Sequence, residues 1–129
     1  TSDLFAEMRA AREVKREFRF HMFLPAGDFT QDPEAKARLA GEMLFIQGVM
    51  DALLIAPDGT LTLVDYKTDR LTRAELRDPA LARAKLLRRH SEQMRYYAEA
   101  AKRIFGQKPK RVLLYSLHAG RAFDATPTA

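Results

Sequence analysis

Two aspartates and a lysine lie at spacings that could support metal-dependent hydrolysis. Asp65 and Lys67 are two residues apart in an apolar segment, so in a strand both side chains would project from one face. Asp51 lies within the apolar run 43–56, where a carboxylate is costly to bury unless it is paired, hydrogen-bonded or bound to a metal. Two carboxylates and a lysine at one place could hold a hard divalent cation and orient water, which suits phosphodiester hydrolysis.

The same residues also have a purely structural interpretation. An Asp-x-Lys pair in a strand can be a surface ion pair, and Asp51 could close a salt bridge within a partly hydrated sheet. Spacing alone leaves both interpretations open.

A β-hairpin would bring these residues together. Pro57-Asp58-Gly59 is a turn signal, and it predicts antiparallel strands over residues 43–56 and 61–67. An earlier half-buried strand, ending at Pro25, is predicted from alternating apolar residues at Phe18, Phe20, Met22 and Leu24. Residues 26–41 lack apolar periodicity and are predicted to form a loop.

A long helix should cover the sheet. Pro79 can open it, Gly106 can close it, and one helical stripe contains Leu86, His90, Met94, Tyr97, Ala101 and Ile104. A short helix is expected at the start of the chain, a strand over 112–117, and an edge strand over 121–125 after a turn at Gly120. This order predicts an α+β (or α/β) domain with a mixed central sheet, an N-terminal helix and one long packed helix.

Composition narrows the class of protein further. A length of 129 residues, with 47% hydrophobic and 30% charged, predicts one folded domain over 1–129. The chain has no cysteine, which excludes disulfides and thiolate metal sites and favours a cytoplasmic setting. No apolar stretch is long enough to span a membrane, so no membrane partner is expected. The first residue is Thr1, and we expect the chain to be a piece of a longer protein.

Positive charge is concentrated in one segment. Residues 67–111 carry 14 basic and 5 acidic side chains, a net charge of +9, against −4 for residues 1–66. Such a block suits a polyanion such as DNA. A solvated helix face with i, i+4 ion pairs, for example around Glu92, explains the same charges.

Three motifs read in order favour the catalytic interpretation. They are Gly48-Val49-Met50-Asp51, then Val64-Asp65-Tyr66-Lys67-Thr68-Asp69, then Gln93-Met94-Arg95-Tyr96-Tyr97. They match the G-x-x-D, D-Y-K-T and Q-x-x-x-Y motifs, and the chain resembles the RecB-like branch of the PD-(D/E)xK nuclease superfamily. The resemblance covers most of the chain and looks closest to the C-terminal nuclease domain of AddA-type ATP-dependent helicase–nuclease subunits.

The resemblance implies a restriction-endonuclease-like core and a role for each motif residue. Asp51 and Asp65 would be ligands of Mg²⁺ or Mn²⁺, with the main-chain carbonyl of Tyr66 as a further ligand, and Lys67 would be the catalytic lysine. Gln93 and Tyr97, one helical turn apart, could position DNA or catalytic side chains. Glu17 could correspond to an upstream acidic residue of the family, although an ordinary exposed Glu explains it equally well.

The resemblance is incomplete in one respect. Family members usually carry a Gly-x-x-x-His motif on an upstream helix, and neither His21, His90 nor His118 lies in that context. Truncation would explain this, with the helicase portion and the ligand helix outside the chain, and the isolated fragment could then be inactive. The three histidines are expected to be structural or exposed.

The implied function is a divalent-metal-dependent DNA exonuclease domain of a bacterial, nucleoid-associated helicase–nuclease that processes double-strand breaks for recombinational repair. The implied partners are single strands of unwound DNA, the helicase portion of the same polypeptide and a second helicase–nuclease subunit. Basic side chains expected to track DNA phosphates are Arg70, Arg73, Lys85, Arg88 and Arg89. Two alternatives are a degenerate nuclease fold that only binds DNA or docks another protein, and a metal-free nucleic-acid-binding domain, which leaves Asp51 unexplained.

Overall fold

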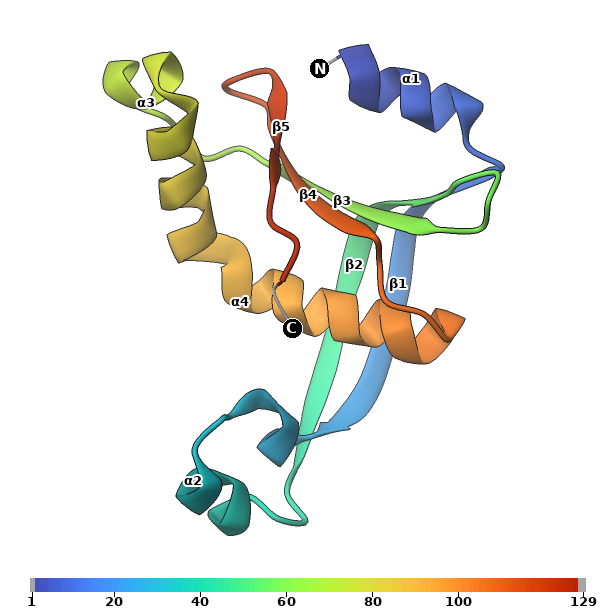
Figure 1. The fold of residues 1–129 in the computed structure, drawn as a ribbon, viewed down its shortest axis with the longest axis vertical. Coiled ribbons are helices and arrows are strands. Elements are labelled where there is room, and N and C mark those ends of the chain that lie inside the picture. Colours follow the sequence, from blue (N-terminus) through green and yellow to red (C-terminus); the bar gives the residue numbers. More distant parts are fainter. Residues whose placement is uncertain (1, 128–129) are drawn as a thin grey trace. The chain divides into compact units, whose positions relative to one another are not determined.

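The computed structural model describes residues 2–127, with side chains from Leu4 onward. It contains four α-helices, one 3-10 helix and five strands among these residues (Figure 1). In chain order the elements are α1 (Ser2–Ala10), β1 (Glu13–Pro25), η1 (Ala26–Phe29), α2 (Pro33–Arg38), β2 (Met43–Ile55), β3 (Leu61–Lys67), α3 (Arg73–Arg77), α4 (Pro79–Phe105), β4 (Arg111–Ser116) and β5 (Arg121–Asp124).

The strands form one mixed sheet in the order β1-β2-β3-β4-β5. β2 and β3 are antiparallel, β3 and β4 are parallel, and β4 and β5 are antiparallel. The parallel pair needs a crossover connection, and α3 and α4 supply it. The predicted α+β class with a mixed sheet is therefore confirmed.

The chain divides into two compact units. One holds the residues up to Phe18 together with those from Met50 onward, and the other holds Arg19–Val49. Strands β1 and β2 contribute residues to both. All of β3, β4, β5 and α4 belong to the first unit. This unit also carries Met50 and Asp51 of the first sequence motif and all of the second and third motifs.

Within the first unit, α1 and α4 lie on opposite sides of the sheet (Figure 1). Leu4 and Met8 of α1 pack against alternate residues of three strands, and these are Ala52, Leu54, Val64, Leu113 and Tyr115. Because successive side chains of a strand point to opposite faces, the intervening residues face α4. That second face contains Leu53 and Leu63, both fully buried, and also Asp51, Asp65 and Lys67.

The long helix follows its predicted bounds. Asp78 caps it by accepting a hydrogen bond from the Ala80 N–H, Pro79 stands at its first position, and Gly106 ends it with φ 77° in the left-handed region. The buried residues of α4 are Ala82, Leu86, Met94, Tyr97, Ala100 and Ala101. Ile104, at the end of the predicted helical stripe, is 40% exposed, and Ala100 is buried in addition to Ala101.

Two short α-helices and the 3-10 helix were not predicted. Residues 26–41 contain η1 and α2 rather than a loop, because Asp32 caps α2 and Pro33 starts it, although α2 buries no side chain. Helix α3 begins at a capping box formed by Thr72 and Glu75. Apolar periodicity cannot detect helices that have no buried face. Among the described helices, none has the length and apolar content needed to cross a membrane.

Candidate active site

The end of the β2–β3 ladder brings two carboxylates together. Ala52 pairs with Val64, and one step further along the same register lie Asp51 and Asp65. The main-chain N–H of Tyr66 donates to Asp51 Oδ2 at 2.7 Å, so a side chain takes the place of a ladder partner there. The N–H and C=O of one strand residue face the same neighbouring strand, and the Tyr66 carbonyl is therefore directed toward β2 as well.

Asp65 is the most constrained group of the site. The residue is only 5% exposed, and Lys67 Nζ lies 2.5 Å from its Oδ2. No hydrogen bond of standard geometry reaches this oxygen from the described residues. Burial raises the pKa of Asp65; the Lys67 ammonium opposes this, and the neighbouring Asp51 carboxylate adds to it, so the pKa lies above its usual value. The chain thus keeps a carboxylate where its charged form is disfavoured.

Lys67 connects the sheet to α4. Its ammonium donates to Gln93 Oε1 at 3.0 Å in addition to pairing with Asp65. Gln93 Nε2 in turn donates to Tyr97 Oη at 3.4 Å, one helical turn further along α4. Tyr97 is buried, so its hydroxyl gives the amide a fixed partner. The structure therefore brings together five residues from the three motifs: Asp51, Asp65, Lys67, Gln93 and Tyr97.

The donor set partly fits a hard divalent cation. Asp51 and Asp65 are adjacent carboxylates, and the Tyr66 carbonyl is directed to the same side. Oxygen ligands of this kind suit Mg²⁺ or Mn²⁺, which commonly keep several waters. No group of three or more His, Asp or Glu side chains in the described part of the chain could hold a metal alone. Water and phosphate oxygens would therefore complete the coordination.

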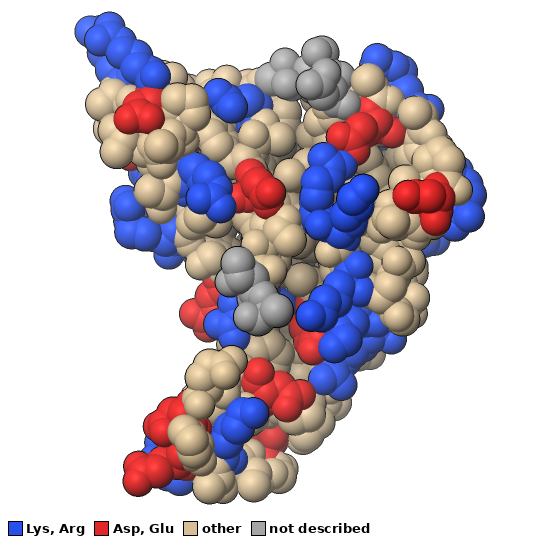
Figure 2. All heavy atoms as spheres, in the orientation of Figure 1, with Lys and Arg blue, Asp and Glu red and all other residues tan. Residues whose placement is uncertain are grey.

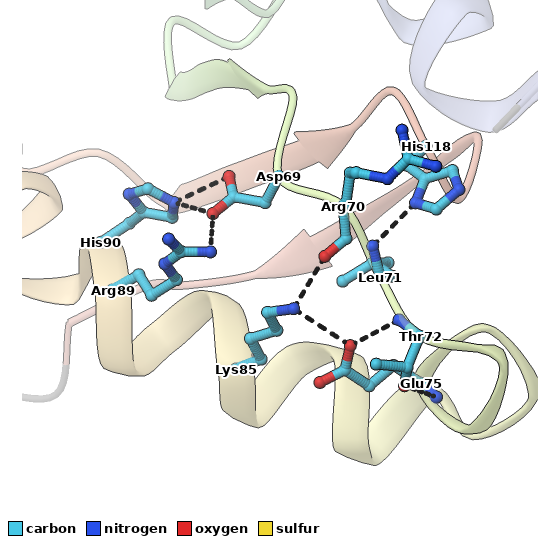
Figure 3. A network of polar contacts seen from close by, with 9 residues as sticks. All are labelled: Asp69, Arg70, Leu71, Thr72, Glu75, Lys85, Arg89, His90 and His118. Atoms are coloured by element: carbon cyan, nitrogen blue, oxygen red, sulfur yellow. Dashed lines mark hydrogen bonds and ion pairs between the residues drawn. The ribbon is translucent and has the colours of Figure 1, made fainter.

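A second polar cluster lies directly after Lys67 (Figure 3). His90 Nε2 on α4 is 2.9 Å from Oδ1 and 3.0 Å from Oδ2 of Asp69, and Arg89 Nη1 is 3.1 Å from Oδ2. Burial opposes ionisation of Asp69, but its hydrogen bonds with His90 and the nearby positive charges outweigh burial, so its pKa lies below its usual value. The cluster fixes the end of β3 to the same helix that contacts Lys67.

The segment after Asp69 is held by main-chain contacts (Figure 3). Lys85 Nζ donates to the Arg70 carbonyl at 2.7 Å and to Glu75 Oε1 at 3.2 Å. The Leu71 N–H donates to His118 Nδ1 at 2.7 Å. His90 and His118 therefore have structural contacts, which agrees with what was expected of them.

The basic side chains expected to contact DNA differ in their surroundings. Arg70, Arg73 and Arg88 are exposed, whereas Lys85 and Arg89 already contact Glu75 and Asp69 respectively. On the face drawn in Figure 2, basic side chains lie along α4 with acidic ones interspersed. Glu99 and Arg103 form an i, i+4 ion pair at 3.8 Å, as expected for a solvated helix face. Part of the charge block therefore forms ion pairs, and three of its arginines are exposed.

Glu17 makes none of the polar contacts that join the other motif residues. It is an exposed residue of β1 with φ 49°, a conformation uncommon for a residue other than glycine. Its side chain makes no hydrogen bond or ion pair within the described part of the chain. No hydrogen bond or ion pair joins it to Asp51 or Asp65 among the described residues.

Sequence reasoning missed the connection between Asp69 and His90. Asp69 lies within the second motif, which assigns it no role, and His90 lies on the helix stripe as an expected structural residue. Their spacing held a signal, because Asp69 is two residues after Lys67 and His90 is three residues before Gln93. The spacing is compatible with two contacts between the same strand end and the same helical stripe, but it does not give the direction in which the helix crosses the sheet.

The lowered pKa of Asp69 makes a pH-dependent contribution to stability. We expect Asp69→Asn to lower the free energy of unfolding by about 1–3 kcal/mol near neutral pH, because the hydrogen-bonded charge is lost. When the pKa of a carboxyl group is lower in the folded protein than in the unfolded chain, its charged form stabilises the fold above the unfolded-chain pKa, which is about 4. This stabilisation is lost as the pH falls through the pKa of the folded protein. Thermal melts of both proteins from neutral to acidic pH should therefore converge. Glu42→Gln, at an exposed carboxylate, is the control, and a difference that does not depend on pH would contradict the assignment.

Comparison with known proteins agrees with this geometry. The sequence pattern of the PD-(D/E)XK nuclease superfamily matches residues 2–126, and the chain belongs to that superfamily. Enzymes of this class generally use divalent metals, and the paired carboxylates with an adjacent lysine are consistent with that chemistry.

The relatives define a narrower group. The chain is 37% identical over 114 residues to the A-type subunit of an ATP-dependent helicase/nuclease from Moorella thermoacetica, covering 88% of the chain and 7% of the relative. Proteins of the same description from Acetivibrio thermocellus and Bacillus velezensis are 33% and 35% identical over 120 residues, covering 93% and 92% of the chain and 9% of each relative. The chain thus spans less than a tenth of these curated relatives. The resemblance to AddA-type subunits inferred from the motifs is confirmed.

Proposed function

We propose that this chain is the divalent-metal-dependent DNA exonuclease domain of a bacterial helicase–nuclease that processes double-strand breaks for recombinational repair. The observation that carries the proposal is the position of Lys67, which contacts Asp65 on the sheet and Gln93 on α4 while Asp51 lies beside Asp65. Membership of a nuclease superfamily and similarity to helicase/nuclease subunits support it. The degenerate-fold alternative gains no support from the site, since all the core motif residues are present.

Each proposed residue has a task that follows from its surroundings. Asp51 and Asp65, with the Tyr66 carbonyl, would hold Mg²⁺ or Mn²⁺, and the ion would supply Lewis-acid activation and charge neutralisation at the phosphate. Lys67, restrained by two partners, would orient the attacking water and offset charge that develops on the phosphate oxygens. Gln93 would keep the ammonium in place, and Tyr97 would support Gln93. The restraint matters because a lysine otherwise has many rotamers to lose.

DNA would approach over the basic segment that follows β3. Arg70, Arg73 and Arg88 are exposed and would contact phosphates without reading sequence. Lys85 and Arg89 would contribute to the local positive potential while remaining bound to Glu75 and Asp69. Binding by this segment should therefore depend on salt far more than on sequence.

In this proposal the chain is the C-terminal nuclease portion of a longer polypeptide. Its helicase portion would deliver single strands in the bacterial cytoplasm, at the nucleoid, together with a second helicase–nuclease subunit. The relatives' description as helicase/nuclease subunits and the small share of their length that the chain covers support this view.

Metal dependence is the direct test of the proposal. A short, labelled single-stranded oligodeoxynucleotide should be cleaved in millimolar Mn²⁺ or Mg²⁺ and remain intact in excess EDTA, because without the ion nothing polarises the phosphate or lowers the pKa of the attacking water. The assay should be run on this chain and on the polypeptide that carries it. Asp65→Ala should abolish cleavage, and Asp58→Ala, in the exposed turn before β3, should not. Metal-independent cleavage, or full activity of Asp65→Ala, would refute the assignment; DNA binding without cleavage in both proteins would favour the degenerate-fold alternative.

A further inference from the structure

In the unit formed by Arg19–Val49, β1 and β2 run side by side as a two-stranded ribbon (Figure 1). One face of this ribbon carries exposed apolar side chains. The Ala26 N–H donates to the Glu42 carbonyl at 2.9 Å, and this bond sets the register of the ribbon. Counting back from that pair places Phe23 opposite Phe45 and His21 opposite Gln47. In an antiparallel pair of strands, side chains of residues that lie directly opposite each other project from the same face.

Two aromatic rings form the centre of this face. Phe23 is 63% exposed and Phe45 is 50% exposed, and their ring centroids are 5.2 Å apart. The His21 ring extends the row, with its centroid 6.2 Å from that of Phe45. Met43, two residues before Phe45 in β2, is also exposed and shares this face. A contiguous group of exposed apolar rings on a charged protein usually marks a binding surface.

Arg19, His21 and Gln47 add polar groups to this face. A hollow of about 560 Å³ is lined by Arg19, Phe20, His21, Gln47, Gly48 and Val49. Within the described part of the chain, the side chains of Arg19, His21 and Gln47 make no hydrogen bond or ion pair. The alternate positions of this face, from Arg19 to Phe23 and from Met43 to Gln47, contain no acidic residue.

We propose that this face binds single-stranded nucleic acid, with bases stacked on Phe23 and Phe45 and the backbone contacted by Arg19. Nucleobases provide flat partners for exposed rings, and strands with aromatic residues on one face are a common platform for them. His21 and Gln47 would donate or accept hydrogen bonds at base edges or phosphates, and the absence of acidic residues suits a polyanion. A protein partner would have to satisfy the same three polar groups while covering the rings. The inference rests on the proposed function, because that function supplies the single strands.

Binding can be measured without cleavage. In excess EDTA, fluorescence anisotropy with a labelled oligodeoxythymidylate should show about 5- to 100-fold weaker binding for Phe23→Ala or Phe45→Ala than for wild type. Phe23→Tyr and Phe45→Tyr should restore affinity, because stacking needs an aromatic ring rather than phenylalanine itself. Leu81→Ala and Leu117→Ala remove similarly exposed apolar side chains in the other unit and should leave affinity unchanged. Circular dichroism melts establish that each variant is folded.

A spectroscopic signature separates stacking from an indirect effect. The chain has no tryptophan, so Phe45→Trp introduces a single indole whose fluorescence should be quenched when the oligonucleotide binds. Phe5→Trp, on α1, is the matched control and should not respond. Wild-type affinity of both alanine variants, or no quenching at position 45, would overturn the proposal. Altered self-association of the variants with DNA affinity unchanged would also overturn it and assign the face to a protein partner.

The two proposals can fail separately. Stacking is tested in EDTA and needs neither metal nor Asp65, whereas the nuclease assignment is tested by cleavage. Loss of quenching with metal-dependent cleavage intact would refute only the stacking surface. Quenching and weakened alanine variants without cleavage would refute only the nuclease activity.

Discussion

Lys67→Met is expected to slow DNA cleavage by about 10²- to 10³-fold while leaving the affinity for single-stranded DNA close to wild type. Methionine keeps most of the length of the side chain but removes the charge that lies 2.5 Å from Asp65 and 3.0 Å from Gln93. The ammonium would act mainly on charge that develops during reaction, so its loss should lower kcat more than it raises KM. Single-turnover cleavage and anisotropy, measured on the same oligonucleotide, separate the two effects.

Two further variants locate the cause of that effect. Lys108→Met removes an exposed ammonium that follows α4 and should cleave at the wild-type rate. Gln93→Ala removes the acceptor that restrains Lys67 and should give a smaller loss than Lys67→Met, because the ion pair with Asp65 remains. Lys67→Met cleaving as fast as wild type would show that the lysine is a structural partner of Asp65 and nothing more.

The geometry of the hairpin could be predicted from local rules. The turn at Pro57-Asp58-Gly59 and the two flanking apolar segments fix an antiparallel pair, and the two-residue period of a strand puts Asp65 and Lys67 on one face. The period of the long helix placed Met94 and Tyr97 inward, with Gln93 one residue to the side. These features depend on residues close together in the sequence, which is why pattern alone could find them.

Contacts over long sequence separations could not be predicted in the same way. The bond from the Tyr66 N–H to Asp51 arises because the ladder stops at Ala52, and no local pattern encodes that stop. The pairing of Asp69 with His90 depends on the direction in which α4 crosses the sheet. The short helix α2 was not predicted because it has no buried face that would produce an apolar period. Its start depends on the local cap at Asp32 instead. Spacing also could not predict that Asp65 is the carboxylate whose charged form is disfavoured, because this depends on its burial.

Asp65→Asn is expected to raise the melting temperature of the metal-free protein at neutral pH. Burial and the adjacent Asp51 raise the pKa of Asp65 despite the Lys67 ammonium, so the folded state disfavours the charged form. When the pKa of a carboxyl group is higher in the folded protein than in the unfolded chain, its protonated form stabilises the fold below the unfolded-chain pKa, which is about 4. This stabilisation is lost as the pH rises through the pKa of the folded protein. The wild-type protein should therefore lose stability relative to Asp65→Asn between mildly acidic and neutral pH. Thermal melts in EDTA across this window measure the difference.

Mn²⁺ should reverse the order of the melting temperatures of wild type and Asp65→Asn. An ion that binds only the folded wild-type site stabilises it by RT ln(1 + [L]/Kd), about 2.7 kcal/mol at 100 times Kd, which is several degrees in melting temperature for a domain of this size. Asp65→Asn lacks one of the two carboxylates and should show almost no metal-induced shift. Asp58→Asn, an Asp in an exposed turn, is the matched control and should keep the full shift. Equal shifts in wild type and Asp65→Asn would place the ion elsewhere. Asp65 would then be a buried ion-pair partner of Lys67, because the chain would retain the unfavourable carboxylate without gaining a metal site from it.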